Sequence, residues 1–251
     1  HSAELQTKCT SCHAGYGWVE GQEYDFSIVE NVDCLACHAS TDVYAKSDYG
    51  DPAEGVDLLA AAQSVAAPTR ANCGSCHFNG GGGDNVKHGD LAETLYYPDQ
   101  EVDVHMGGND FLCTDCHWTQ DHQILGRLVV DNYLGDPAEQ VACTNCHAEV
   151  PHDDERLNNH VQSVACQTCH VPTIALDEPT KMYWDWSTSW QDQPEDHYTY
   201  LKIKGTFIYE QNVMQTYLWF NGNLSYRSLL GDPINQAGPT IMNVPAGSIS
   251  D

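Results

Sequence analysis

The sequence predicts a mainly α-helical protein with much irregular structure and few short strands. Two observations predict this fold class. The first is the pentapeptide Cys-x-x-Cys-His, which occurs six times and uses all 12 cysteines of the 251 residues. The second is a composition poor in aliphatic residues that includes 20 glycines, which allow backbone to approach a neighbouring group closely because they lack a Cβ.

The pentapeptide is the attachment motif of a c-type haem. Two thiols form thioether bonds to the porphyrin, and the adjacent histidine ligates the iron from one face. Zinc pairs, disulfide frameworks and thioredoxin-like redox pairs also use paired cysteines, but none requires a histidine directly after the second one. We therefore expect six haem c groups, held by Cys9, Cys12, Cys34, Cys37, Cys73, Cys76, Cys113, Cys116, Cys143, Cys146, Cys166 and Cys169. The expected proximal iron ligands are His13, His38, His77, His117, His147 and His170.

Six haems in a chain of this length must form much of its interior, so we expect a chain of haems as the core. Residues 1–170 carry all six motifs and form the predicted six-haem region. Residues 171–251 carry no motif and are rich in aromatic side chains. We expect this segment either to wrap the haem core or to dock onto a neighbouring subunit.

The motifs are each expected to begin or lie on a short helix. The sequence Gly-Asp-Pro-Ala-Glu occurs at 50–54 and 135–139, and both copies are predicted helix starts, with aspartate as N-cap and proline at the first helical position. The first copy leads into a predicted helix over 56–65.

Two further features concern loops and strands. The glycine-rich loop at 78–84 lacks the Gly-Lys-Ser/Thr ending of a phosphate-binding loop, so close backbone approach to a haem explains it better. Two β-prone runs, 204–209 and 216–220, lie near an Asn221-Gly222 turn signal.

The histidine count predicts how the irons are ligated. A haem used for electron transfer usually has both axial positions filled, whereas a catalytic haem keeps one open. Seven of the 13 histidines remain after the proximal six, and six haems need six more ligands. We predict His88, His105, His122, His152 and His160 as distal ligands, with either His1 or His197 as the sixth. His1, at the first residue, could reach a neighbouring subunit. The alternative distal ligands are Met106, Met182, Met214 and Met242.

The chain is strongly acidic, with a formal charge of −26, which disfavours nucleic acid and anionic membranes as partners. No apolar stretch is long enough to span a bilayer. Because haem c is attached outside the cytoplasm, we expect an extracellular or cell-surface protein, or alternatively a periplasmic one. We expect the chain that starts at His1 to be a mature product whose leader has been removed. Whether calcium binds among the acidic loops stays open.

The residues around the motifs resemble the octahaem tetrathionate reductase family of multihaem c-type cytochromes. The resemblance covers nearly the whole chain and matches the family's C-terminal six-haem part. It is carried by the segments at 9–18, 32–38, 68–84, 87–91, 103–106, 164–173, 180–188, 204–207 and 219–222. The resemblance implies the family's fold and haem arrangement. In the family, the lysine-ligated haem that binds substrate lies in the N-terminal part, and no motif of this sequence replaces it.

Three functions are consistent with these features. The favoured one is electron transfer through closely packed bis-histidine haems, in a homopolymer that forms a conductive extracellular filament and passes electrons to redox proteins or extracellular acceptors. A monomeric electron shuttle is the second. The third is an enzyme that reduces tetrathionate, nitrite or hydroxylamine at one open haem, with basic residues such as Arg70, Lys181, Lys202 or Lys204 around it.

Overall fold

The computed structural model describes residues 11–17, 25, 27–47, 50–80, 83–86, 90–126, 141–191, 205–217 and 248–249. The chain divides into two compact units, His1–Asp115 and Cys116–Asp251. Short helices joined by irregular segments dominate the described residues, and the strands are few and short, which confirms the predicted fold class. The predicted division at residue 170 follows the distribution of motifs along the chain, and it stays a prediction.

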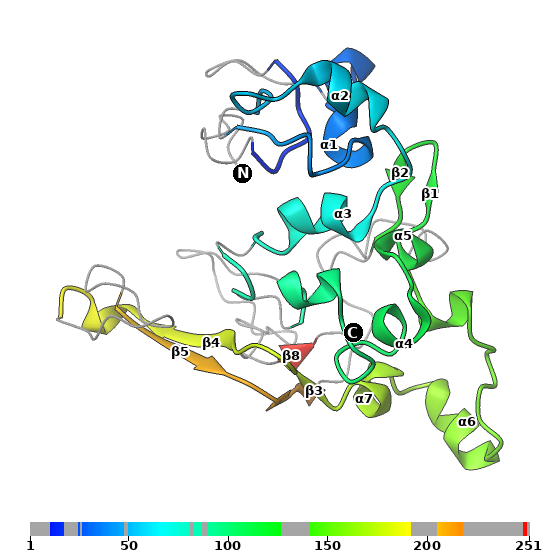
Figure 1. Cartoon of the computed structure of the whole chain (residues 1–251). Coiled ribbons are helices and arrows are strands. Elements are labelled where there is room, and N and C mark those ends of the chain that lie inside the picture. The colour runs from blue at the N-terminus through cyan, green and yellow to red at the C-terminus, as the bar shows by residue number, and fades with distance from the viewer. Residues whose placement is uncertain are drawn as a thin grey trace. The chain divides into compact units, whose positions relative to one another are not determined.

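The first unit is built from short helical elements (Figure 1). They are η2 (Val29–Asn31), α1 (Cys34–His38), α2 (Leu58–Gln63), α3 (Arg70–His77), η3 (Glu93–Tyr96) and α4 (Met106–Asn109), and α5 (Cys113–Cys116) follows at the boundary.

The second unit combines helices with two-stranded sheets. Its helical elements are η5 (Cys143–Asn145), α6 (Glu155–Val161), α7 (Gln167–His170) and η6 (Trp186–Thr188). Its strands are β1 (Thr119–Gln120), β2 (Gln123–Ile124), β3 (Thr173–Ile174), β4 (Thr180–Asp185), β5 (Thr206–Glu210), β6 (Val213–Met214), β7 (Thr216–Tyr217) and β8 (Ser248–Ile249). The pairs β1–β2, β3–β6 and β4–β5 are antiparallel, and β7–β8 is parallel. The β4–β5 pair forms the longest ribbon (Figure 1).

Helical turns carry the motifs whose residues are all described, as predicted. The second, third, fourth and sixth motifs lie on or reach into α1, α3, α5 and α7, and the fifth begins with η5. Polar side chains cap two of these helices at their N-termini. Asp33 accepts hydrogen bonds from the first turn of α1, and Thr69 forms a capping box with Asn72 on α3.

The helix start predicted at Gly-Asp-Pro-Ala-Glu was wrong for the first copy. Pro52 lies in an isolated antiparallel bridge with Lys46, and the chain then turns at Gly55, whose φ is +87°. Helix α2 begins only at Leu58, where the Asp57 side chain accepts from the amides of Leu59 and Ala60. The second copy, at 135–139, lies outside the described residues.

The two β-prone runs have different outcomes. The first is confirmed as β5, which pairs with β4. In the second run, β7 is described only at Thr216–Tyr217, where it pairs with β8. The turn signal at Asn221-Gly222 lies outside the described residues.

The apolar core of the described residues is small. In the first unit, Tyr44 and two alanines form a buried cluster against which residues of α1 pack. A second contact joins α3 to η3, where the Phe78 and Tyr96 rings meet edge to face at 4.8 Å. Gly74, inside the third motif, is required for this contact, because a Cβ there would overlap both rings. The only buried apolar side chain described in the second unit is Ala175.

A buried polar network connects the first two motifs. The ammonium group of Lys46 donates to the carbonyls of His13 and Gly15 at 2.8 and 2.7 Å. The same group lies 3.6 Å from the Asp33 carboxylate, to which the Tyr44 hydroxyl donates at 2.6 Å. Burial and this hydrogen bond raise the pKa of Tyr44 well above its usual range. The chain therefore holds the end of the first motif beside the start of α1 by polar contacts.

Candidate haem-binding sites

The cysteines of the motifs are oriented as attachment points and not as core residues. Free cysteine is among the most buried residue types in proteins. Here all 11 described cysteines are exposed or only partly buried. Cys9 lies outside the described residues. Exposed paired sulfurs beside a histidine fit covalent attachment to a planar group that covers them.

His38, the proximal ligand predicted for the second motif, is clamped to the loop that follows α2. Its Nδ1 donates to the carbonyl of Ala66 at 2.9 Å, and its own carbonyl accepts from the Ala66 amide at 2.9 Å. Histidines that ligate a metal usually donate their other ring nitrogen in this way, which fixes the tautomer and the ring orientation. Because Nδ1 is engaged in this contact, a bond to iron would be formed by Nε2.

His117, in the fourth motif, is oriented in the same way. Its Nδ1 donates to the carbonyl of Leu125 at 2.9 Å. Leu125 ends the β1–β2 hairpin, and its backbone amide donates to the carbonyl of Trp118. The turn residues Asp121 and His122 both have positive φ, as in a type I′ turn. A histidine predicted as a distal ligand thus lies exposed at the tip of a hairpin that orients a proximal one.

The structure brings His152, a predicted distal ligand, next to His170, the proximal histidine of the sixth motif. Their ring centroids are 5.9 Å apart and the ring planes differ by 11°. Two imidazoles on opposite faces of one iron would place their ring centres roughly 6 Å apart, because each metal–nitrogen bond is about 2 Å long. The two rings are stacked, and the distance between their centres is compatible with two imidazoles that would hold one iron.

The surroundings of His152 support this interpretation. Its Nδ1 is buried and has no hydrogen-bond partner within the described part of the chain, which is uncommon for a buried polar atom. The backbone on either side of the ring is fixed by Asn158 of α6. The Asn158 side chain accepts from the His152 amide at 3.0 Å and donates to the His152 carbonyl at 2.6 Å.

The other predicted distal ligands are dispersed. His105 is exposed and precedes α4, with its ring 5.7 Å from that of Phe111. His160 lies exposed near the end of α6. His1, His88 and His197 lie outside the described residues, so their roles stay predictions. The same holds for the methionine alternatives, since no described contact joins Met106, Met182 or Met214 to a motif histidine and Met242 is not described.

Cysteines of different motifs approach one another within the first unit. A hydrogen bond with the Cys113 thiol, together with burial, raises the pKa of Cys73. Burial also raises the pKa of Cys76, and the neighbouring Cys12 thiol contributes in the same direction. The third motif therefore lies close to both the first and the fourth.

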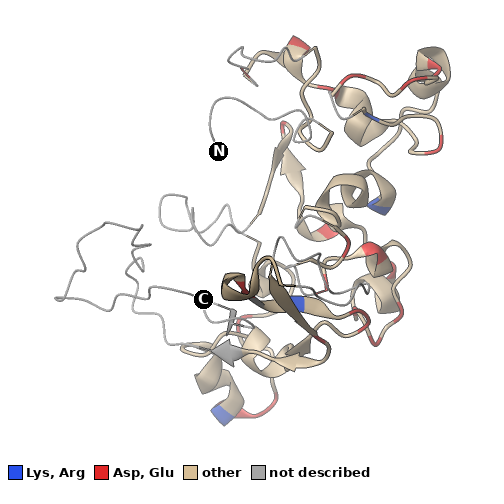
Figure 2. Ribbon diagram, turned by 90° about the vertical axis from the view of Figure 1, so that its left-hand side faces the viewer, with Lys and Arg blue, Asp and Glu red and all other residues tan. Residues whose placement is uncertain are grey.

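The basic residues predicted to surround an anionic substrate make other contacts where the structure describes them. Arg70, 12% exposed, donates to three backbone carbonyls and pairs with Asp110. Lys181 lies over the Phe207 ring, 4.1 Å from its centroid. Lys202 and Lys204 lie outside the described residues. Acidic residues are spread over the described ribbon, whereas basic residues are few (Figure 2).

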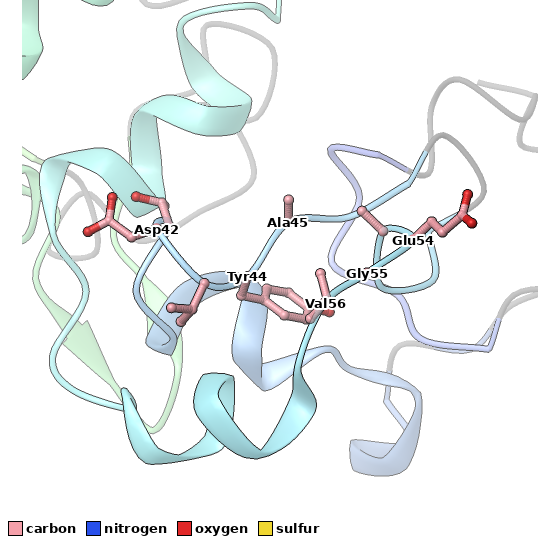
Figure 3. A pocket seen from close by; sticks show the side chains of 9 residues that line it. Asp42, Tyr44, Ala45, Glu54, Gly55 and Val56 are labelled. Atoms are coloured by element: carbon pink, nitrogen blue, oxygen red, sulfur yellow. The ribbon is translucent and has the colours of Figure 1, made fainter.

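Two cavities described here lie in the first unit. The smaller, about 270 Å³, is lined by residues 41–45 and 53–56, with Asp42 and Glu54 at opposite ends of it (Figure 3). The larger, about 490 Å³, lies beside His38 and is also lined by Arg70, Tyr96 and Tyr97. Within the described residues, no group of three or more His, Cys, Asp or Glu side chains could hold a metal ion.

Sequence reasoning missed the residues that position the motifs. Lys46, Asn72 and Arg70 act on backbone atoms more than 25 residues away along the chain, and no local pattern marks such partners. Asn158 binds the backbone of His152, six residues before it. The helix caps were recognisable, because Asp33 and Thr69 each stand directly before a motif helix.

The fold and the attachment motifs together are those of a multihaem c-type cytochrome. Within the described residues, no helix is long and apolar enough to cross a membrane.

Comparisons with known proteins agree with this class. The chain is similar to an octahaem cytochrome c from Shewanella oneidensis, with a TM-score of 0.76 and 46% identity over 91% of this chain and 52% of that one. This confirms the resemblance found in the sequence. A family model described as "Cytochrome c bacterial" matches residues 181–251, which carry no attachment motif. An uncharacterized protein from Archaeoglobus fulgidus is 32% identical over 147 residues, 51% of this chain and 49% of that protein. The chain thus spans about half the length of both relatives.

Replacement of His152 by alanine tests the axial pair. We expect one haem to change from low spin to high spin while the total haem content per chain stays the same, because only the distal bond is lost. Low-temperature electron paramagnetic resonance (EPR) of the ferric protein measures this change.

Added imidazole provides the control for His152→Ala, since it should restore the low-spin state by filling the position that the side chain leaves. A spectrum indistinguishable from that of the wild type before imidazole is added would remove His152 from the ligand set.

Proposed function

We propose that the chain binds six haem c groups and functions as an electron carrier in which protein histidines fill both axial positions of every iron. The paired His152 and His170 rings carry this proposal, because a predicted distal imidazole lies with its ring centre 5.9 Å from that of a predicted proximal one. When bound, haem c supplies a reversible one-electron change at its iron.

The ligand assignment extends this pair to the remaining motifs. The proximal ligands are His13, His38, His77, His117, His147 and His170, and the distal ones are His88, His105, His122, His152, His160 and either His1 or His197. Three local features support it. His38 and His117 each present one ring nitrogen after the other has donated to a carbonyl. None of the ten described histidines is buried in protein.

The histidines and basic side chains of the chain favour electron transfer over catalysis. A reductase of an anionic substrate needs one open iron and nearby cations. Of the basic residues named above for a reductase, Arg70 and Lys181 are described, and they are engaged by backbone carbonyls and by an aromatic ring. Seven histidines remain for the six distal positions, so the chain has enough to close every iron.

The finer proposal is that copies of the chain assemble into an extracellular filament. Its support lies in the C-terminal segment, where Trp186 and Trp190 are 58% and 74% exposed. Large exposed aromatic side chains are typical of surfaces that bind another protein. The partners in this proposal are further copies of the chain and redox proteins or extracellular acceptors, and a monomeric shuttle is the alternative.

The reaction of the reduced protein with carbon monoxide tests the closed coordination. We expect no spectral change on adding the gas, because it needs an open position on ferrous haem. Turnover assays with tetrathionate, nitrite and hydroxylamine should likewise show no activity above that of free haem. Binding of the gas at one haem, together with turnover of one of these substrates, would instead establish a reductase.

Negative-stain electron microscopy of the haem-loaded protein tests the filament. We expect long filaments with a regular repeat, and His1→Ala should shorten them if that histidine ligates a haem across the junction. His197→Ala is the matched variant, and the two together identify the sixth ligand. Dispersed small particles of the wild-type protein would leave the electron carrier as a monomer.

A further inference from the structure

Arg70 occupies a helix position that local energetics disfavour. It is the first residue of α3, the helix that carries the third motif. The N-terminus of a helix favours anions, because its unpaired amide groups give it a partial positive charge. A cation at this position therefore has to be stabilised by contacts outside its own helix.

Those contacts all go to one segment, residues 96–111. The guanidinium group donates to the Phe111 carbonyl through Nε at 3.1 Å and Nη2 at 2.7 Å. Nη2 also donates to the Met106 carbonyl at 2.9 Å, and Nη1 donates to that of Tyr96 at 3.4 Å. With its side chain 12% exposed, Arg70 is nearly withdrawn from solvent and depends on these acceptors.

The carbonyls that Arg70 binds stand on either side of His105. Met106 directly follows the histidine. The Phe111 amide donates to the His105 carbonyl at 3.2 Å, and the two rings lie 5.7 Å apart. On the other side, Asp103 accepts from the amides of His105 and Met106 at 2.8 and 2.7 Å. Gly107 allows this loop to pack against Asp99, whose backbone a Cβ would overlap.

We propose that Arg70 is a positioning residue for His105, one that fixes the loop bearing this distal ligand against the helix that bears the third motif. The inference rests on the proposed function, in which His105 ligates a haem. The planar fork of arginine is required because it reaches several carbonyls at once, whereas a lysine ammonium is a single point of charge. Asp110 contributes little, since its side chain is 96% exposed and its ion pair with Arg70 is open to solvent.

The test compares four variants of the haem-loaded protein: His105→Ala, Arg70→Gln, Arg70→Lys and Asp110→Asn. Each is measured by low-temperature EPR and by carbon monoxide binding after reduction. His105→Ala should convert one haem to high spin. Arg70→Gln should convert part of the same haem to high spin. The fraction of this haem that binds carbon monoxide should rise by about tenfold or more, the size of effect seen when a metal ligand loses its supporting contacts. Added imidazole should restore the low-spin state in both. Asp110→Asn, which keeps a residue tolerant of the φ of +56° at this position, should match the wild type.

The outcomes separate the inference from the proposed function. If His105→Ala converts one haem while both Arg70→Gln and Arg70→Lys stay fully low spin and unreactive, Arg70 does not position the ligand, and the electron-carrier proposal stands. If His105→Ala is itself unchanged, the ligand assignment fails and the inference fails with it. If Arg70→Gln does not accumulate with full haem content, Arg70→Lys replaces it in the test. When Arg70→Lys is warmed, the haem that His105 ligates should become high spin at a lower temperature than in the wild type.

Discussion

The structure depends on polar side chains that reach from one haem motif to the backbone of the next. Lys46 binds the carbonyls that end the first motif and pairs with the cap of the second. Asn72, inside α3, donates to the carbonyl of Ala39 at 2.7 Å, directly after the second motif. Arg70, also in α3, donates to the carbonyl of Phe111, just before the fourth motif. Such contacts matter because the part of the chain that the structure describes buries few apolar side chains, so hydrophobic packing there cannot fix its segments alone.

This arrangement suits a protein whose interior is shared with planar cofactors. Hydrogen bonds to backbone carbonyls are directional, so they set the spacing and orientation of short helices without occupying the faces that porphyrins would cover. The same directionality fixes the imidazoles, as the contacts of His38 and His117 with carbonyls illustrate. In the first unit, Lys46, Asp33 and Arg70 use their charged groups to hold backbone segments together.

The sequence was informative where chemistry imposes a local pattern. The class of cofactor, the short helices at the motifs and the strand at β5 could all be predicted, because each depends on residues adjacent in the chain. The start of α2 was mispredicted because Gly55 and the bridge at Pro52 outweigh a good capping sequence. The partners of Arg70 and the pairing of His152 with His170 could not be predicted, since both join residues that only tertiary structure brings together.

The most direct test of the central claim is a count of haems and spin states in one preparation. Pyridine haemochrome analysis gives the number of haem c groups per chain, and quantitative low-temperature EPR gives the spin state of each ferric iron. The account predicts six haems per chain, all of them low spin in the native protein. Fewer than six haems, or one that is high spin in the wild type, would contradict a carrier with every axial position closed by histidine.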